Sequence, residues 1–550
     1  MIRRLAWLLP LAFVLLYLIP LGQRPLWEPD ESRYAEISRE MLQADSWAVP
    51  KFLALDYFEK PVLGYWLNSM SMAVFGENAF AVRFMSAIAA AASAFIIYLL
   101  SLHILQNRAA ALASAAVYLS FFIVFMIGTY STLDSMLSFW LSAAFACFYW
   151  AVQAQASKDK FIRYGLFGAL CGAAFMTKGF VALALPVVAI VPFMVLTRRF
   201  QELIGYGLYI VVVATIVALP WSISVHFQAD DYWNYFFWEE HIRRFSSDNA
   251  QHKEPFWFYI PWLLVGAMPW GLAFFSVLKT KIWSQNKDFY WYLFLWFLMP
   301  ILLLSYAKGK LPTYILPCFA PLAIYLGNGI VKLIADKQWH KFKLIAWSNI
   351  VFAGSLLVAL ILAMLGVIGD GPLYQLAEMP KIICALIIFM SWLALGVSLL
   401  LQPEHGAFAK ITLMPVALML LLPFSGPNLI LDSKAPEGFL QRVAPIFEQN
   451  THFIADDVGL AGSIAFEYQR SDITLWGSKG EVAYGLEMNP DKQRYIPWAQ
   501  ASERILQLQQ QQSVAVMMRR QSVPAQGELP EADKIVRQGR FILYFYKRAN

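Results

Sequence analysis

Residues 204–226 have the sequence IGYGLYIVVVATIVALPWSISVH, which contains no acidic residue, no lysine and no arginine. A helix of this length rises ~34 Å, enough to cross the ~30 Å hydrocarbon core of a bilayer. The rest of the chain is similar in composition, because 59% of its 550 residues are hydrophobic and only 15% are charged. Soluble domains carry about 25% charged residues. The sequence therefore predicts an integral membrane protein.

Apolar segments of this kind recur along most of the chain, and we count thirteen. They are residues 5–21, 82–105, 109–128, 133–152, 161–177, 179–197, 204–226, 257–278, 289–306, 313–334, 344–367, 381–401 and 411–430. Only helices and closed barrels satisfy their backbone polar groups within lipid, and runs of this length are helical. We expect a mainly α-helical polytopic protein with about thirteen transmembrane helices.

Lysine and arginine residues gather in alternate short loops between these segments. They are Arg3, Arg4, Arg108, Lys158, Lys160, Arg163, Arg198, Arg199, Lys279, Lys281, Lys287, Lys337, Lys341, Lys343 and Lys410. Because cytoplasmic loops are enriched in basic residues, this pattern predicts a cytoplasmic N-terminus. An odd number of spans then places the C-terminus and the long loops 22–81 and 227–256 outside the cytoplasm, where we expect the chemistry.

The composition changes after about residue 430, which divides the chain into a transmembrane domain, 1–430, and a soluble domain, 431–550. The soluble domain has a mixed pattern that predicts a small α/β fold. The expected strands are 452–457, 472–476, 513–520 and 540–547, and the expected helices are 461–470 and 498–511. No phosphate-binding glycine motif occurs there, so nothing indicates a nucleotide.

The net charge and the cysteines exclude two further classes of function. The net charge of +6 is modest and is explained mostly by the basic loops, so we expect no nucleic-acid partner. The four cysteines lie singly within apolar segments, which argues against disulfides and a cysteine-based metal site.

The first long loop begins with WEPDESRYAE, residues 27–36. On a helix that starts near Pro29, Asp30 and Arg33 lie toward one side. Acidic residues also stabilise a helix N-terminus, so a capped interfacial helix is the alternative interpretation.

The same loop continues with DYFEKPVLGYW, residues 56–66, in which Glu59 and Lys60 stand beside aromatic rings. Lys60 could bind a phosphate group. The alternative is an interfacial lysine that pairs with Glu59 and keeps its charge in water.

Two shorter motifs lie at span ends on the same predicted side of the membrane. TLDS contains Asp134, and MTKG contains Lys178. Each could be structural, because a charge at a span boundary costs less than one at the centre of the bilayer. Together they add one acid and one base to the face that carries the first loop.

The loop 227–256 contains EEHIRRF, residues 239–245, with Arg243 and Arg244 side by side. Arginine pairs suit phosphate because the guanidinium group makes bidentate, charge-assisted hydrogen bonds. A helix in which Glu239 or Glu240 pairs with these arginines is the alternative.

The motif KGKLPTYILP, residues 308–317, carries Lys308, Lys310 and Tyr314 in a predicted extracytoplasmic turn, so its two lysines break the positive-inside pattern. A bound anion explains this positive charge better than topology does. This is the strongest physical indication of an anionic substrate.

Taken together, the six motifs resemble those of the lipid A aminoarabinose transferases of Gram-negative bacteria, membrane glycosyltransferases of the C-type fold. The resemblance extends over the whole chain. It implies transfer of 4-amino-4-deoxy-L-arabinose from undecaprenyl phosphate to lipid A phosphates on the periplasmic face of the inner membrane. The expected consequence is resistance to polymyxin and cationic antimicrobial peptides.

The resemblance also implies roles for individual residues. Asp30 is similar to the family's catalytic carboxylate, and we group Glu31, Arg33 and Asp134 with it as catalytic candidates. The candidates for binding substrate or carrier phosphate are Tyr57, Lys60, Lys178, Arg243, Arg244, Lys308, Lys310 and Tyr314. Glu59 and His241 match positions that can hold zinc in a family member, but two ligands make a thin site.

We therefore expect a glycosyltransferase that acts as a monomer, requires no cofactor and could hold a divalent metal. Its partners would be the undecaprenyl-phosphate-linked donor, the lipid A acceptor and membrane lipids. The first alternative is a transferase that uses another polyprenyl-phosphate sugar, such as mannose for transfer to protein. A flippase for lipid-linked sugars is the second alternative.

Overall fold

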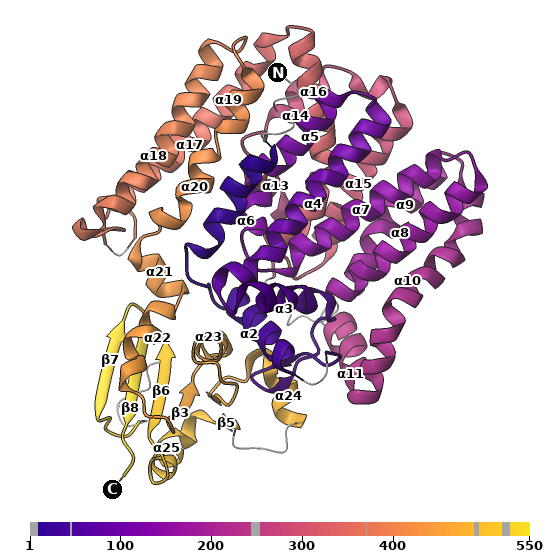
Figure 1. Ribbon diagram of the computed structural model, residues 1–550. Helices are drawn as coiled ribbons and strands as arrows, with labels where there is room; N and C mark the ends of the chain where they lie inside the picture. The colour runs from indigo at the N-terminus through magenta and orange to yellow at the C-terminus, as the bar shows by residue number, and fades with distance from the viewer. Residues whose placement is uncertain are drawn as a thin grey trace. The chain divides into compact units, whose positions relative to one another are not determined.

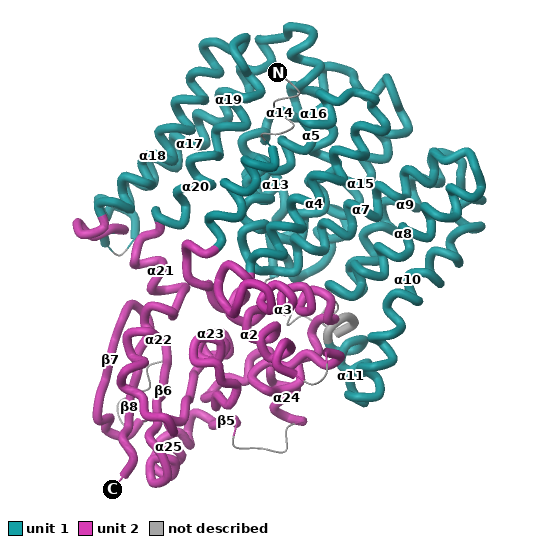
Figure 2. The backbone as a smooth tube through the Cα atoms, viewed as in Figure 1, with its two compact units in different colours: residues 1–21, 83–372, 379–425 teal, residues 22–82, 373–378, 426–550 magenta. Residues whose placement is uncertain are grey.

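The computed structural model describes residues 9–44, 47–243, 253–369, 371–488, 494–519 and 529–549, with only the backbone for 240–243. The chain forms two compact units (Figure 2). Unit 1 comprises residues 1–21, 83–372 and 379–425, and unit 2 comprises residues 22–82, 373–378 and 426–550.

Unit 1 is built from helices (Figure 1). They are α4 (Ala79–Leu105, which enters the unit at Arg83), α5 (Arg108–Ser120), α6 (Phe122–Gly128), α7 (Leu133–Gln153), α8 (Ser157–Lys178), α9 (Val181–Leu196), α10 (Phe200–Gln228), α11 (Tyr232–Asn234), α13 (Tyr259–Gly266), α14 (Ala273–Leu278), α15 (Lys287–Tyr306), α16 (Phe319–Ala335), α17 (Phe342–Met364), α18 (Met379–Leu401), α19 (Ala407–Leu413) and α20 (Val416–Ser425). A π-helical segment, η3 (Tyr235–Arg243), follows α11, and a 3₁₀ segment, η6 (Pro312–Cys318), precedes α16.

Each of the thirteen predicted spans coincides with helical residues in the described chain. Eight of the described helices are long and apolar enough to cross a membrane, and a ninth span results if the bent pair α5 and α6 counts as one. Three further apolar helices, Leu9–Gly22, Val181–Leu196 and Phe256–Gly266, are shorter. Helix α8 is 22 residues long but carries several charged residues in its first two turns. All thirteen predicted spans therefore lie on helical residues, and eight or nine of the described spans are long and apolar enough to cross a membrane.

The core of unit 1 is rich in aromatic side chains from α7 and α15. Phe145 and Trp296 stack with ring centroids 4.5 Å apart, and the Tyr292 hydroxyl donates to the Phe145 carbonyl at 2.6 Å. All three side chains are buried. Because a buried tyrosine hydroxyl needs a partner, this bond fixes the two helices in one register.

Helices α8 and α10 approach closely at two glycines spaced four residues apart. A Cβ atom on Gly168 would lie 2.6 Å from the Ile210 carbonyl oxygen, and one on Gly172 would lie 2.6 Å from the Ala214 carbonyl oxygen. Small residues at this spacing let two membrane helices bring their backbones together.

Unit 2 combines helices with two sheets (Figure 1). Its helices are α2 (Asp30–Gln43), α3 (Leu63–Phe75), α21 (Asn428–Lys434), α22 (Glu437–Val443), α23 (Val458–Tyr468), α24 (Ala483–Met488) and α25 (Ala501–Gln509). Its strands are β1 (Lys51–Phe52), β2 (Leu55–Asp56), β3 (His452–Ala455), β4 (Thr474–Trp476), β5 (Tyr495–Ile496), β6 (Val514–Arg519), β7 (Lys534–Gln538) and β8 (Phe541–Tyr546).

The larger sheet has the order β5-β4-β3-β6-β8-β7. Strands β5, β4, β3 and β6 pair in parallel, whereas β6, β8 and β7 pair antiparallel. The four predicted strands match β3, β4, β6 and β8, and the two predicted helices match α23 and α25, so the prediction of an α/β domain is confirmed. Strands β5 and β7 were not predicted, because β5 has two residues and β7 is largely exposed.

The compact units do not follow the predicted boundary at residue 430, because loop 22–81 groups with the C-terminal residues. Glu28 accepts hydrogen bonds from Arg519, at 3.0 Å, and from Arg540. The Leu53 carbonyl accepts from Arg494 at 2.8 Å. Buried charges and carbonyl groups require such partners, and here the partners lie more than 400 residues away in sequence.

We predict that Gly172→Val lowers the thermal stability of the purified protein, because the new side chain would meet a backbone oxygen that cannot move alone. Overpacking of this kind costs roughly 1–3 kcal/mol. Gly207→Val, at a position of α10 with no atom within 4 Å, is the matched control. Equal melting temperatures for the two variants would contradict the close approach of α8 and α10.

Candidate functional site

Helix α2 begins at Asp30, as the motif predicted, and its first turn holds an ion pair. An Arg33 Nη atom lies 2.5 Å from Asp30 Oδ1, one turn along the helix. The Asp30 side chain is 38% exposed, whereas the Arg33 side chain is 10% exposed. The carboxylate can therefore reach a substrate while the arginine holds it from within.

Arg33 has a second acidic partner in the C-terminal part of unit 2. Glu481 forms an ion pair with the guanidinium group and lies 3.4 Å from the hydroxyl of the buried Tyr57. The Arg33 guanidinium also stands over the Tyr34 ring, 5.1 Å from its centroid. Arg33 is thus fixed by two carboxylates and an aromatic ring.

The protonation states in this cluster follow from burial and charge. Burial alone would lower the pKa of Arg33, but Tyr57, Glu481 and Asp30 raise it well above its ordinary value. Burial and the charge of Glu59 raise the pKa of Tyr57 well above 10. Arg33 is therefore a permanent cation, and Tyr57 is a neutral phenol that donates a hydrogen bond.

Glu31, adjacent to Asp30, has a different environment. Its side chain is fully buried, accepts hydrogen bonds from Arg24 at 2.6 and 3.1 Å, and accepts another from the Trp27 backbone at 3.0 Å. These contacts hold the chain that enters α2. Glu31 therefore has a structural role in this loop.

Lys60 lies in the extended segment that precedes α3. Its ammonium group donates to the Glu59 carbonyl at 2.9 Å, and its side chain is half-buried. This contact joins Lys60 to the backbone of its neighbour, and the alternative of a pair between the two side chains stays open.

Three motifs of unit 1 meet in a second cluster. Lys178, at the end of α8, lies 2.5 Å from Asp134 in the first turn of α7. Its ammonium group also lies 4.4 Å from the centroid of the Tyr314 ring, on η6. The side chains of Asp134 and Lys178 are 9% and 11% exposed. The sequence predicted that these two residues lie on one side of the membrane, and the structure shows in addition that they form an ion pair.

The two lysines that follow α15 differ in their surroundings. Lys308 is exposed. Lys310 is buried and donates to the Glu254 carbonyl at 2.7 Å, beside a bridge between Lys253 and Gly309. Burial lowers the pKa of Lys310, and the Glu254 charge opposes that shift. Lys310 is therefore held within its loop, whereas the side chain of Lys308 is exposed.

Three candidates from the loop 227–256 lie outside the described side chains: His241, Arg243 and Arg244. The proposed zinc pair thus retains only Glu59 as a described member. No group of three or more histidine, cysteine, aspartate or glutamate side chains in the described part of the chain is arranged to hold a metal ion.

Comparison with known proteins reveals relatives that match from end to end. The undecaprenyl phosphate-alpha-4-amino-4-deoxy-L-arabinose arabinosyl transferase of Aeromonas salmonicida is 43% identical over 545 residues, 99% of each chain. The protein of the same name from Pectobacterium atrosepticum is 40% identical over 553 residues. This chain belongs to that transferase family. It is a glycosyltransferase and a multi-pass membrane protein.

Family models and a solved structure agree with this membership. The model for the C-terminal domain of arabinosyl transferase ArnT matches residues 431–545, and the model for dolichyl-phosphate-mannose-protein mannosyltransferase matches residues 3–236. The crystal structure of ArnT from Cupriavidus metallidurans bound to undecaprenyl phosphate covers 98% of this chain with a TM-score of 0.81 and 20% identity. The fold expected for C-type glycosyltransferases is confirmed.

Glu481 is the residue of the Asp30 cluster that sequence reasoning missed. It lies in SKGEVAYG, residues 478–485, which has no periodic pattern and no clustered charge of one sign. The only available indication was an acidic residue next to a glycine turn and a tyrosine in the soluble domain. Nothing local links it to Arg33, 448 residues earlier.

We predict that Lys178→Met and Asp134→Asn each destabilise the protein, because either change leaves a nearly buried charge without its partner. Such a loss costs about 3–5 kcal/mol. The double variant should lose less stability than the two single variants together, because it leaves neither charge unpaired. Thermal unfolding of the purified proteins measures these losses. Additive losses would mean that the pair contributes no coupling.

Proposed function

We propose that this protein transfers 4-amino-4-deoxy-L-arabinose from undecaprenyl phosphate to phosphate groups of lipid A. The observation that carries the proposal is the end-to-end similarity to proteins that are named for this donor. The six motifs of the sequence resemblance support the same reaction. Modified lipid A would carry less negative charge, which explains the expected resistance to polymyxin and cationic antimicrobial peptides.

The reaction breaks the bond between the anomeric carbon of the sugar and a phosphate oxygen of the carrier. A new bond forms between that carbon and a phosphate oxygen of lipid A, and undecaprenyl phosphate leaves. The leaving phosphate gains charge, so preorganised cations lower the barrier. We assign this role to Lys60 and Lys308, with Arg243 and Arg244 as further candidates, and we assign contact with the carrier phosphate to Tyr314 and Lys178.

We propose that Asp30 interacts with the sugar of the donor and does not act as a general base. A phosphate monoester with a second pKa of about 6 is largely ionised at neutral pH, so it needs no general base. A half-exposed carboxylate held by Arg33 can instead orient the donor or stabilise positive charge that develops on the sugar ring.

The proposed location is the inner membrane, with a cytoplasmic N-terminus and a periplasmic C-terminal domain. The distribution of lysine and arginine among the loops supports this orientation. We propose that the enzyme acts as a monomer. We also propose that it requires no cofactor, because its own lysine and arginine side chains can stabilise the leaving phosphate. Zinc at Glu59 and His241 remains a prediction from the resemblance.

The test is mass spectrometry of lipid A from a polymyxin-sensitive strain that makes the donor but lacks the transferase. Complementation with the wild-type gene should add one or more aminoarabinose masses to lipid A. Unmodified lipid A, with the protein present in the membrane, would contradict the acceptor assignment. Mannosylated protein or an intact, translocated donor would instead favour the two alternatives.

Asp30→Asn should lower the transfer rate by a factor of about 10² or more, because a neutral amide cannot stabilise developing positive charge. Asp230→Asn is the matched control, since Asp230 is exposed and lies in a different loop. The wild-type rate should follow ionisation of the acceptor phosphate as the pH rises. If the rate of the wild type also rose with pH near pH 5, and this rise were absent in Asp30→Asn, Asp30 would be a general base.

Glu481 is proposed as a positioning residue that acts through Arg33. Its carboxylate and that of Asp30 share one buried guanidinium group, so loss of the Glu481 charge lets Arg33 move relative to Asp30. Small displacements of catalytic groups reduce kcat strongly. The C-terminal domain would thereby contribute directly to the geometry of Asp30.

Glu481→Gln should lower kcat about tenfold with little change in KM, because the substrate contacts remain while the orientation of Asp30 is lost. Glu481→Asp should restore part of the rate, since it keeps the charge. The control is Glu487→Gln, which removes an exposed partner of Lys479 in the same segment. Equal rates for the Glu481→Gln and Glu487→Gln variants would refute the positioning role.

A further inference from the structure

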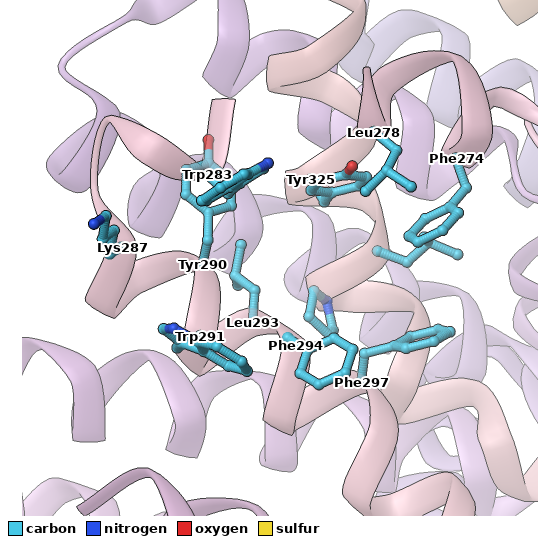
Figure 3. A pocket seen from close by; sticks show the side chains of 12 residues that line it. Phe274, Leu278, Trp283, Lys287, Tyr290, Trp291, Leu293, Phe294, Phe297 and Tyr325 are labelled. Carbon is cyan, nitrogen blue, oxygen red and sulfur yellow. The ribbon is translucent and has the colours of Figure 1, made fainter. Parts of the chain in front are cut away.

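A cavity of about 490 Å³ lies among α14, α15 and α16 of unit 1 (Figure 3). Twelve side chains line it, most of them aromatic or aliphatic, and Lys287 is the only charged one. Cavities of a few hundred Å³ take one small ligand or one chain of a larger ligand. None of the motifs assigned to sugar transfer contributes to the lining.

The lining includes one charged side chain, Lys287, and two phenol hydroxyl groups, those of Tyr290 and Tyr325. Figure 3 shows Lys287 on one side and Phe274 and Phe297 on the other. The Tyr290 hydroxyl receives a hydrogen bond from Asn328 at 2.5 Å. The Tyr325 hydroxyl is buried and has no hydrogen-bond partner within the described chain. A hydroxyl without a protein partner can form a hydrogen bond with a ligand that enters the cavity.

Lys287 is also available to a ligand. It is exposed and, among the described residues, makes no hydrogen bond or ion pair. Lys279 and Lys281, both exposed, lie in the short connection between α14 and α15. The segment 279–287 therefore carries three exposed lysines, and the exposed Asp288 follows Lys287.

The cavity is remote from the lysines that follow α15. Lys287 is the first residue of that helix and Tyr306 the last, so the two ends are about 28 Å apart. Lys308 and Lys310 come after Tyr306, at the other end. The exposed Trp283 and Trp291 stand at the Lys287 end, as aromatic residues do at a membrane interface.

We propose that this cavity binds one anionic phospholipid from the leaflet at the Lys287 end of α15. The lipid phosphate accepts hydrogen bonds from Lys287, and one acyl chain lies along Leu293, Phe294 and Phe297. The basic loop distinguishes an anionic headgroup from a zwitterionic one, since basic residues near a membrane attract acidic lipids. The site is separate from sugar transfer and does not depend on the donor or the acceptor.

The experiment measures phospholipid retention by the purified full-length protein in native mass spectrometry. Phosphatidylglycerol, phosphatidylcholine with the same acyl chains, and undecaprenyl phosphate are added separately to wild type and variants. Wild type should retain phosphatidylglycerol more strongly than phosphatidylcholine. The double variant Lys287→Gln/Trp291→Ala should weaken phosphatidylglycerol binding about tenfold.

The matched control is Lys343→Gln/Trp347→Ala on α17. Its residues have the same i,i+4 spacing, are exposed, and do not line the cavity. The control should bind phosphatidylglycerol like wild type, and Lys287→Arg should also retain binding. Equal losses in both double variants, equal retention of the two phospholipids, or a selective loss of undecaprenyl phosphate in Lys287→Gln/Trp291→Ala would each overturn the proposal.

Discussion

The organisation of unit 2 depends on the pairing of one buried cation, Arg33. A guanidinium group in a nearly dry environment must have acidic partners, because an unpaired buried charge is too costly to keep. Asp30 satisfies part of this requirement from the same helix, and Glu481 satisfies the rest from the C-terminal domain. The pairing of Arg33 therefore joins the first loop to the end of the chain, together with the contacts of Glu28 and Leu53.

The same constraint operates elsewhere in the structure. The fully buried carboxylate of Glu28 is held by Arg519 and Arg540, although burial still raises its pKa above the ordinary value. In unit 1, Asp134 and Lys178 satisfy each other at the ends of two spans. Long apolar helices leave few places for charge, so charged side chains gather at helix ends, where reactive groups can also be reached from water.

Local patterns predicted the elements of the fold well. Each of the thirteen apolar segments found by hydropathy coincides with helical residues of the described chain, and the WEPDESRYAE motif predicted a helix that begins next to Pro29 with Asp30 and Arg33 on one side. Both follow from regularities that act within a few residues. Strand β7 escaped prediction because it lies at the sheet edge, where an exposed strand need not show an alternating apolar pattern.

The sequence by itself determined the membrane class, the positions of the apolar helical segments and the residue types available for phosphate chemistry, because these depend on composition and short-range spacing. Only the tertiary structure decided which of those residues are exposed and which are buried. Asp30 is partly exposed and Glu31 is buried, since neighbours on a helix point about 100° apart. Likewise, Lys310 is bound to the Glu254 carbonyl while Lys308 is exposed. Such differences depend on packing partners distant in sequence, which no local pattern records.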